Sequence, residues 1–268
     1  MQTLNQPSLI RIKNLFGEFL GTCILSFIGC SAVAFAVLSE MFSSIVPIAC
    51  VWGIGVTLAI YATKSYSNAH LNPAVSFGFY TNNEINIKEL CSYWFVQLLG
   101  GFFAGLGVYF CFISEIENFE SIHKIIPTDH SGAYTASIFG EFFPNPGYQE
   151  AIPYISEISA CFYEGVGTFI LMSSILYFTK SKKTTRFSPV LIGLTVALLI
   201  IWIAPFTQCG INPARDFGPR LVAYFLHWGN GAFPDGQISF LTVYIVSPLV
   251  GAFLASILYQ RIRNLFKW

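Results

Sequence analysis

Residues 69–78 read AHLNPAVSFG, and residues 210–221 read GINPARDFGPRL. Both stretches place the tripeptide Asn-Pro-Ala at the start of a short apolar run. Proline suits the first turn of a helix, where its missing N–H is no loss, and asparagine is a favoured N-cap. A helix of about ten residues rises about 15 Å, roughly half the thickness of a bilayer. The two tripeptides therefore predict two half-length helices.

The sequence around these stretches is typical of a membrane protein. Hydrophobic residues make up 54% of the 268 residues and charged residues 10%, and the mean hydropathy is +0.60. A soluble domain carries about 25% charged residues. Six further apolar runs are long enough to cross a hydrocarbon core of about 30 Å as helices. They cover approximately residues 15–38, 44–63, 88–112, 152–178, 188–206 and 240–260. The first is interpreted as an uncleaved span, because it lacks the cleavage site of a signal peptide.

The chain also repeats itself. Residues 17–25, GEFLGTCIL, match residues 163–171, YEGVGTFIL, and the match aligns Glu18 with Glu164. Each half has three spans, with a half-length helix between its second and third. Because three is an odd number, the two halves lie in opposite directions across the membrane. An inverted repeat of this kind places a solute pathway at the interface of the halves.

These observations predict an all-α integral membrane protein with six transmembrane helices and two re-entrant half-helices. The chain, 1–268, is interpreted as one channel domain, whose halves cover approximately 13–113 and 152–265 and are joined by an extracellular loop, 114–151. Irregular backbone survives at membrane depth only where it is buried in protein or lines a cavity. The two half-helices should therefore meet with their positive N-termini near the midplane.

The charges predict an orientation and exclude one class of partner. Net charge is zero and no long charged block occurs, so a nucleic-acid partner is not expected. With both termini in the cytoplasm, the outer loops carry one basic residue, Lys124, and Arg215 and Arg220 fall in the second half-helix. The remaining basic residues lie on the inner side, as the positive-inside rule requires: Arg11, Lys13, Lys64, Lys88, Lys180, Lys182, Lys183, Arg186, Arg261, Arg263 and Lys267.

The seven cysteines form no CxxC pair and show no metal-ligand spacing. Most are interpreted as small buried hydrophobic residues rather than disulfide partners or metal ligands. Neither a metal nor a cofactor is expected. Glu18 and Glu164 fall inside spans, where a carboxylate is costly unless it has partners such as exposed loop amides. Their symmetry favours a scaffold role over a proton relay.

The two Asn-Pro-Ala stretches resemble the signature loops of the aquaporin and aquaglyceroporin superfamily, and the similarity covers roughly residues 13–265. The resemblance implies a right-handed bundle with one pore per subunit, assembled as a homotetramer in the lipid of the plasma (inner) membrane. It places six residues at the pore centre: Asn72, Pro73, Ala74, Asn212, Pro213 and Ala214. It also implies that Glu18 and Glu164 hold the re-entrant loops.

The resemblance assigns further residues to the pore wall. The carbonyls of Asn68, Ala69, His70, Gln208, Cys209 and Gly210 match the family's ladder of acceptors. Trp52, Ile200, Cys209 and Arg215 match its selectivity filter. Cys209 stands where glycerol facilitators carry phenylalanine, and Ile200 where they usually carry glycine. This filter resembles the nodulin-type branch, as does the segment FGEFFPNPG (139–147).

Five positions that separate the subfamilies are of the glycerol type: Phe112, Asp216, Arg220, Pro248 and Leu249. Together these features predict a passive channel for glycerol and water that excludes ions and protons. A water-selective channel and a channel for metalloid hydroxides such as boric or arsenous acid remain alternatives, and urea is a further candidate solute.

Two other classes of protein fit the sequence less well. An ion-coupled secondary transporter also uses inverted repeats, but it needs acids or bases on its pathway. Here the intramembrane carboxylates match scaffold positions. An integral membrane enzyme would need a nucleophile–base pair, a metal cluster or a phosphate loop, and the sequence shows none of these. The chain is therefore not expected to be an enzyme.

Overall fold

The computed structural model describes residues 12–39, 42, 44–234 and 237–266. Arg11 and Lys267, assigned above to the inner side, lie outside the described residues. The long α-helices are α1 (Ile12–Ser39), α2 (Ile45–Thr63), α4 (Ile87–His123), α6 (Glu157–Lys180), α7 (Ser188–Thr207) and α10 (Ser247–Phe266). The shorter ones are α3 (Pro73–Thr81), α5 (Ala133–Ala136), α8 (Pro213–Ala223) and α9 (Gln237–Leu241).

Among the described residues, six helices are long and apolar enough to cross a membrane, which confirms the predicted spans. Three of their ends differ from the prediction by five residues or more, and one of these is the end of α10, at Phe266 rather than at 260. Helix α4 continues past 112 to His123, because its last turns bury Ile116 and Glu120, and it ends at Lys124 in the left-handed region. Helix α6 begins at Glu157 rather than at 152. Ser156 caps this start, because its hydroxyl accepts a hydrogen bond from Ser159 N.

The last span is assembled from three pieces. Helix α9 continues through a π-helical turn, Thr242–Val246, into α10, so that the apolar stretch runs from 238 to 265. A second π-helical turn, Tyr224–Trp228, follows α8. Such turns are rare and add one residue to a helical turn.

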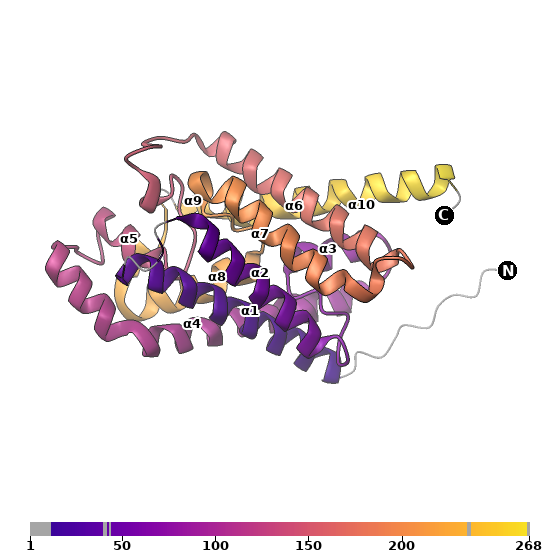
Figure 1. Ribbon diagram of the computed structural model, residues 1–268, viewed down its shortest axis with the longest axis horizontal. Helices are drawn as coiled ribbons and strands as arrows, with labels where there is room; N and C mark the ends of the chain where they lie inside the picture. Colours follow the sequence, from indigo (N-terminus) through magenta and orange to yellow (C-terminus); the bar gives the residue numbers. More distant parts are fainter. Residues whose placement is uncertain (1–11, 40–41, 43, 235–236, 267–268) are drawn as a thin grey trace.

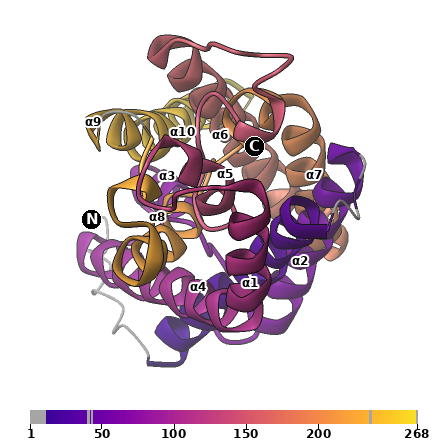
Figure 2. The same ribbon diagram turned by 90° about the vertical axis from the view of Figure 1, so that its left-hand side faces the viewer.

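The helices form two groups related by the inverted repeat (Figures 1 and 2). Helix α1 packs against α2 and α4 in the first group, and α6 packs in the same way against α7 and α10 in the second. The groups meet where α2 packs against α7. Each half-helix packs against the last span of the other group, α3 against α10 and α8 against α4. Because each half-helix packs against the other group, the two halves are interlocked.

Glycine allows the close approach of α8 to α4. A Cβ atom added at Gly218 would lie 2.6 Å from the backbone carbon of Gly101, which is far inside van der Waals contact. Small residues at such crossings let helix backbones approach closely in membranes. This crossing fixes the depth and direction of α8, the helix that carries Arg215.

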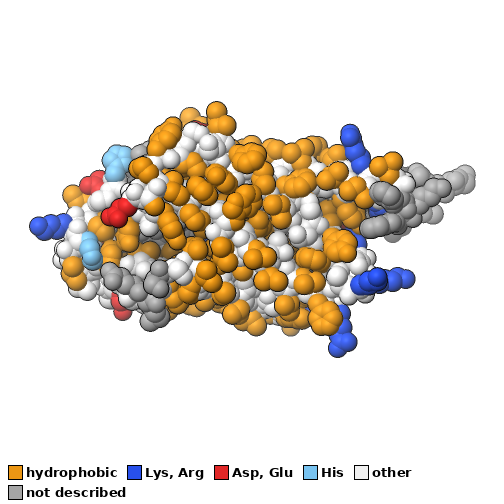
Figure 3. Space-filling view, turned by 45° about the horizontal axis from the view of Figure 1, so that its top comes forward, with side chains coloured by type: hydrophobic (Ala, Val, Ile, Leu, Met, Phe, Trp, Pro, Cys, Tyr) orange, Lys and Arg blue, Asp and Glu red, His pale blue; other side chains and the backbone are white. Residues whose placement is uncertain are grey.

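The surface of the molecule fits a bilayer. Figure 3 shows hydrophobic side chains over the middle of the molecule, whereas Lys and Arg side chains lie mainly at the end where α1 begins and α10 ends. Large apolar side chains point outward from several helices, for example Phe95 and Phe110 on α4 and Phe162 on α6. A soluble monomer rarely exposes so continuous an apolar surface.

Candidate functional site

The two Asn-Pro-Ala stretches meet inside the bundle. Asn72 caps α3, its Oδ1 accepting from Ala74 N at 2.8 Å, and Asn212 caps α8, its Oδ1 accepting from Ala214 N at 3.1 Å. Each Nδ2 then donates to the opposite loop, Asn72 to Ile211 O and Asn212 to Leu71 O, both at 2.9 Å. An asparagine amide has two N–H groups, and this contact uses one of them.

The loops that lead into the half-helices run through unusual backbone conformations. Ala69 and Leu71 have φ of 51° and 52°, and Cys209 and Ile211 have φ of 66° and 38°. For residues other than glycine, each such conformation costs of order 1–3 kcal/mol and is kept only where surrounding contacts enforce it. The strain therefore predicts strong anchors for both loops.

Two buried carboxylates provide those anchors. Glu18 on α1 accepts from His70 N at 3.0 Å, from Leu71 N at 2.7 Å and from Gln97 Nε2 at 2.9 Å. Its side chain is fully buried. Hydrogen bonds to a charged acceptor are worth about 1.5–3 kcal/mol each, enough to offset the strain of the loop.

Glu164 on α6 repeats the arrangement in the second half. It accepts from Gly210 N at 2.9 Å, from Ile211 N at 2.7 Å and from Thr207 Oγ1 at 2.6 Å. The side chain is again fully buried. The two glutamates therefore hold the N–H groups of both loops from α1 and from α6.

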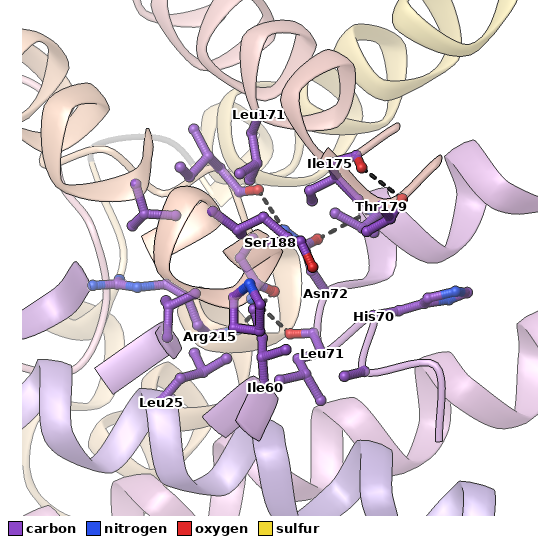
Figure 4. Close-up of a pocket in the computed structure, with 18 of the residues that line it drawn as sticks. Leu25, Ile60, His70, Leu71, Asn72, Leu171, Ile175, Thr179, Ser188 and Arg215 are labelled. Atoms are coloured by element: carbon purple, nitrogen blue, oxygen red, sulfur yellow. Dashed lines mark hydrogen bonds between the residues drawn. The ribbon is translucent and has the colours of Figure 1, made fainter. Parts of the chain in front are cut away.

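Two cavities lie inside the bundle. The first, called the inner cavity because it lies toward the end of the molecule where α1 begins, has a volume of about 190 Å³ and runs from Lys64 and Ser188 past Asn72 to Arg215. Figure 4 shows Asn72 between Arg215 and His70 in this cavity. The outer one has a volume of about 370 Å³. Residues 68–70 and 209–210 line the inner cavity, whereas Gln208 lines the outer one.

The junction of the two cavities is formed by residues that the sequence assigned to the filter. Trp52, Ile200 and Arg215 line both cavities, and Cys209 lines the inner one. The Arg215 guanidinium lies over the Trp52 ring, with its central carbon 4.1 Å from the ring centroid. This stacking presents an aromatic wall and a row of N–H donors at one level of the pore.

Arg215 also has an ionic partner. Its Nη1 forms an ion pair with Oε1 of Glu141, and the two side chains are 7% and 3% exposed. Glu141 comes from the connection between α5 and α6 and lines only the outer cavity. The arginine at the junction is therefore charge-compensated.

A second buried ion pair holds the backbone of Glu141. Arg220 Nη2 donates to Asp216 Oδ1 at 2.6 Å, and both side chains are fully buried. Asp216 Oδ1 accepts from Glu141 N at 2.7 Å, and the carbonyl of Glu141 accepts from Arg220 Nη2 at 2.5 Å. Gly140 permits this approach, because a Cβ there would lie 2.6 Å from the Arg220 guanidinium carbon.

The chain matches the family model described as Major intrinsic protein over residues 5–259. It belongs to the major intrinsic protein family. It is similar to the glycerol uptake facilitator proteins of Haemophilus influenzae (34% identity over 252 residues, 92% of each chain) and Escherichia coli (33% identity over 263 residues, 97% of this chain and 90% of that one). The aquaglyceroporin from Plasmodium falciparum has a similar structure, with a TM-score of 0.80, 26% identity, and coverage of 94% of this chain and 96% of that one.

Three of the positions expected to mark the subfamily lie away from the pore of this major intrinsic protein. Phe112, Pro248 and Leu249 line neither cavity. Phe112 packs edge-on against Phe35, with ring centroids 5.2 Å apart. The other two markers, Asp216 and Arg220, bind the backbone of Glu141, whose side chain pairs with Arg215.

Sequence reasoning missed Glu141. The resemblance covers its segment, FGEFFPNPG, as a whole and assigns no role to the carboxylate. One signal could have found it: it is the single charge in an apolar stretch of a chain with 10% charged residues. Carboxylates in such surroundings are rarely buried without a partner.

Proposed function

We propose that this major intrinsic protein is a passive channel for glycerol and other small uncharged solutes, including water, and that it excludes ions and protons. The observation that carries the proposal is the junction of the two cavities. There Arg215 lies over Trp52 beside Ile200, next to loop residues 68–70 and 209–210, which line the inner cavity. The similarity to glycerol uptake facilitators supports glycerol as a solute.

A linear polyol fits this wall. Glycerol has a carbon edge and a hydroxyl edge, so it needs an apolar surface on one side and hydrogen-bonding groups on the other. Trp52 and Ile200 supply the apolar surface. Arg215 supplies donors, and the carbonyls of residues 68–70 and 208–210 supply acceptors. Each hydroxyl left unpaired in such a constriction costs about 1–3 kcal/mol, which disfavours solutes of the wrong pattern.

The pore centre is proposed to break the proton wire. Asn72 and Asn212 stand at the N-termini of α3 and α8, where the helix dipoles place positive potential. Their remaining amide N–H groups donate to one solute oxygen, so that a water molecule there cannot also accept a proton from its neighbours. Positive half-helix ends also disfavour cations.

The channel is further proposed to be a homotetramer of the plasma (inner) membrane with both termini in the cytoplasm. The excess of Lys and Arg at the end where α1 begins and α10 ends supports this orientation. Each of the two halves, 13–113 and 152–265, then contributes one re-entrant helix to every pore.

Stopped-flow light scattering on reconstituted vesicles tests the proposal. Vesicles placed in a glycerol gradient should shrink and then reswell, faster than protein-free vesicles and with a low activation energy. A channel needs no ion gradient, which separates it from a secondary transporter. Shrinkage without reswelling, together with fast water flux, would indicate a water-selective channel instead. The uptake of boric acid and of urea is measured in the same vesicles. It tests whether Cys209, in place of a phenylalanine, makes the aperture wide enough for these solutes.

A further inference from the structure

Gln208 ends α7 in a backbone conformation that suits another residue type. Its φ is 61°, in the left-handed region, and its N–H donates to Ala204 O at 3.0 Å. Helices that end in this way usually carry glycine there, and sometimes asparagine. A strained residue at such a place is a reason to look for a function of its side chain.

The side-chain amide of Gln208 reaches out of its own loop. Its Oε1 accepts from Phe142 N at 2.7 Å, and its Nε2 donates to Ser137 O at 3.5 Å. Both partners are backbone groups of the segment that begins at the end of α5 and leads to α6. We call this pair of contacts the Gln208 bridge. A glycine would make the same turn but could not form the bridge.

The segment at the far side of the bridge is itself held in place. Asn145 N donates to Phe206 O at 3.2 Å, and Asn145 Nδ2 donates to Ala204 O at 2.7 Å. The backbone of Glu141, next to Phe142, is bound by the buried ion pair of α8. The Gln208 bridge therefore joins the second Asn-Pro-Ala loop to a fixed support.

The inverted repeat shows that the two loops are anchored differently. In the first loop the Ser67 hydroxyl accepts from Ala69 N at 3.0 Å. Thr207 occupies the matching place in the second loop, and its hydroxyl donates to Glu164 instead, at 2.6 Å. The Gln208 bridge thus gives the second loop a contact with the outer segment in addition to its carboxylate anchor.

The bridge lies at the level of the filter. Gln208 lines the outer cavity, whereas Cys209, the next residue, lines the inner one. The loop therefore passes the junction of the cavities between these two residues. Cys209 is 3% exposed and also has a left-handed φ, of 66°. A movement of Gln208 would carry Cys209 with it, because a single peptide bond separates them.

We propose that Gln208 is a positioning residue of the filter, whose bridge to the outer segment holds Cys209 in place at the junction. The inference rests on the proposed function, since it concerns the same junction. Glycerol needs an apolar wall and hydrogen-bonding groups at fixed places, so its passage depends on this positioning. Water is smaller and finds partners in several orientations, so its passage depends on it less.

The variant Gln208→Gly separates the bridge from the turn. Glycine adopts the left-handed conformation without strain, so a residue needed only to end α7 would be replaced without loss. A residue needed for the bridge would not. Gln149→Gly is the matched control, since Gln149 is an exposed residue of the segment that leads to α6.

Glycerol and water rates are measured by stopped flow on vesicles that contain equal amounts of assembled protein. In Q208G the glycerol-to-water ratio should fall about fivefold, as expected for the loss of one or two hydrogen bonds that position the filter. Q149G should match the unaltered protein. An unchanged ratio in Q208G, or equal losses of both rates, would overturn the inference.

The position of Cys209 is measured separately, by its rate of labelling with iodoacetamide, followed by peptide mass spectrometry. Cysteine reactivity depends on exposure, so a loop without the bridge should be labelled at Cys209 at least about threefold faster, while the buried Cys30 serves as internal reference. Equal labelling of Cys209 in Q208G and in the unaltered protein would contradict the inference. If the unaltered protein passes no glycerol, the proposed function fails, and the labelling still decides whether Gln208 positions Cys209.

Gln208→Met keeps the test decisive where Q208G does not assemble. Methionine has a side chain of similar length and flexibility but no amide, so it removes the bridge and leaves the strained turn as it is. The same fall of the glycerol-to-water ratio and the same faster labelling of Cys209 are expected. A Q208M channel that matches the unaltered protein in either measurement would show that the bridge does not position the filter.

Discussion

Replacing Arg215 with valine should turn this channel into one that leaks cations, and the structure gives the reason. Arg215 and Glu141 form a buried ion pair at the junction of the two cavities. Removing the arginine leaves the Glu141 carboxylate without its counter-charge at this junction. The variant therefore gains a net negative site as well as a wider aperture.

The size of the effect follows from Coulomb's law. A cation about 6 Å from an unpaired carboxylate, at an effective dielectric constant of about 20, is attracted by about 3 kcal/mol. That free energy corresponds to roughly a hundredfold rise in local cation occupancy. Removing both charges, in Arg215→Val combined with Glu141→Gln, restores neutrality. The double variant should therefore leak far less than Arg215→Val alone, although its aperture is equally wide.

Conductance across planar bilayers in potassium chloride measures the leak. Arg261→Val is the matched control, since Arg261 is exposed near the end of α10, and it should conduct no more than the unaltered protein. The comparison of the single and double variants decides the matter. If the double variant conducts as much as Arg215→Val, the leak comes from the wider aperture, and the charge-compensation argument is wrong.

Three further predictions concern single residues. Cys209 lines the inner cavity, so Cys209→Ser should keep transport and lose inhibition by mercurials in the stopped-flow assay. Undiminished block would point to another cysteine. Glu164→Gln replaces an acceptor of three hydrogen bonds with a group that also donates, and should destabilise the fold by about 2–4 kcal/mol. Heating in detergent measures this loss, with exposed Glu150→Gln as control; equal stability of the two would argue against the anchor role. Gly218→Ala places a methyl group against Gly101 and should cost about 1–3 kcal/mol; a variant as heat-stable as the unaltered protein would show that α4 and α8 can separate freely.

The parts of the fold that could be predicted from the sequence are those with local causes. Asn72 and Asn212 cap the half-helices through N–H groups two and three residues ahead, so the signal lies within each tripeptide and its neighbours. The spans were predictable from length and hydropathy alone. Their ends were not, because the last turns of α4 are held by burial of Ile116 and Glu120, which depends on tertiary contacts.

The filter was only partly predictable. Trp52, Ile200 and Arg215 could be named from the resemblance, and the structure brings them to one junction; their part in selectivity stays a prediction. The residues of the proposed carbonyl ladder could be named by position. Their distribution between the two cavities, with Gln208 in the outer one, could not be predicted. That distribution depends on how Gln208 reaches the connection between α5 and α6, where its Oε1 accepts from Phe142 N at 2.7 Å.

Charge balance explains why Glu141 escaped notice and how it could have been found. The second half-helix carries Arg215, Asp216 and Arg220, which leave one positive charge over after the Asp216–Arg220 pair is formed. A charge buried at membrane depth is costly unless it is paired. A carboxylate from elsewhere in the chain is therefore expected to pair with Arg215. No sequence spacing predicts its position, because it lies in the connection between α5 and α6 rather than on a helix face. The single charge in FGEFFPNPG meets this expectation. In a membrane protein, an unbalanced cation in a re-entrant helix is thus a reason to search the long loops for its partner.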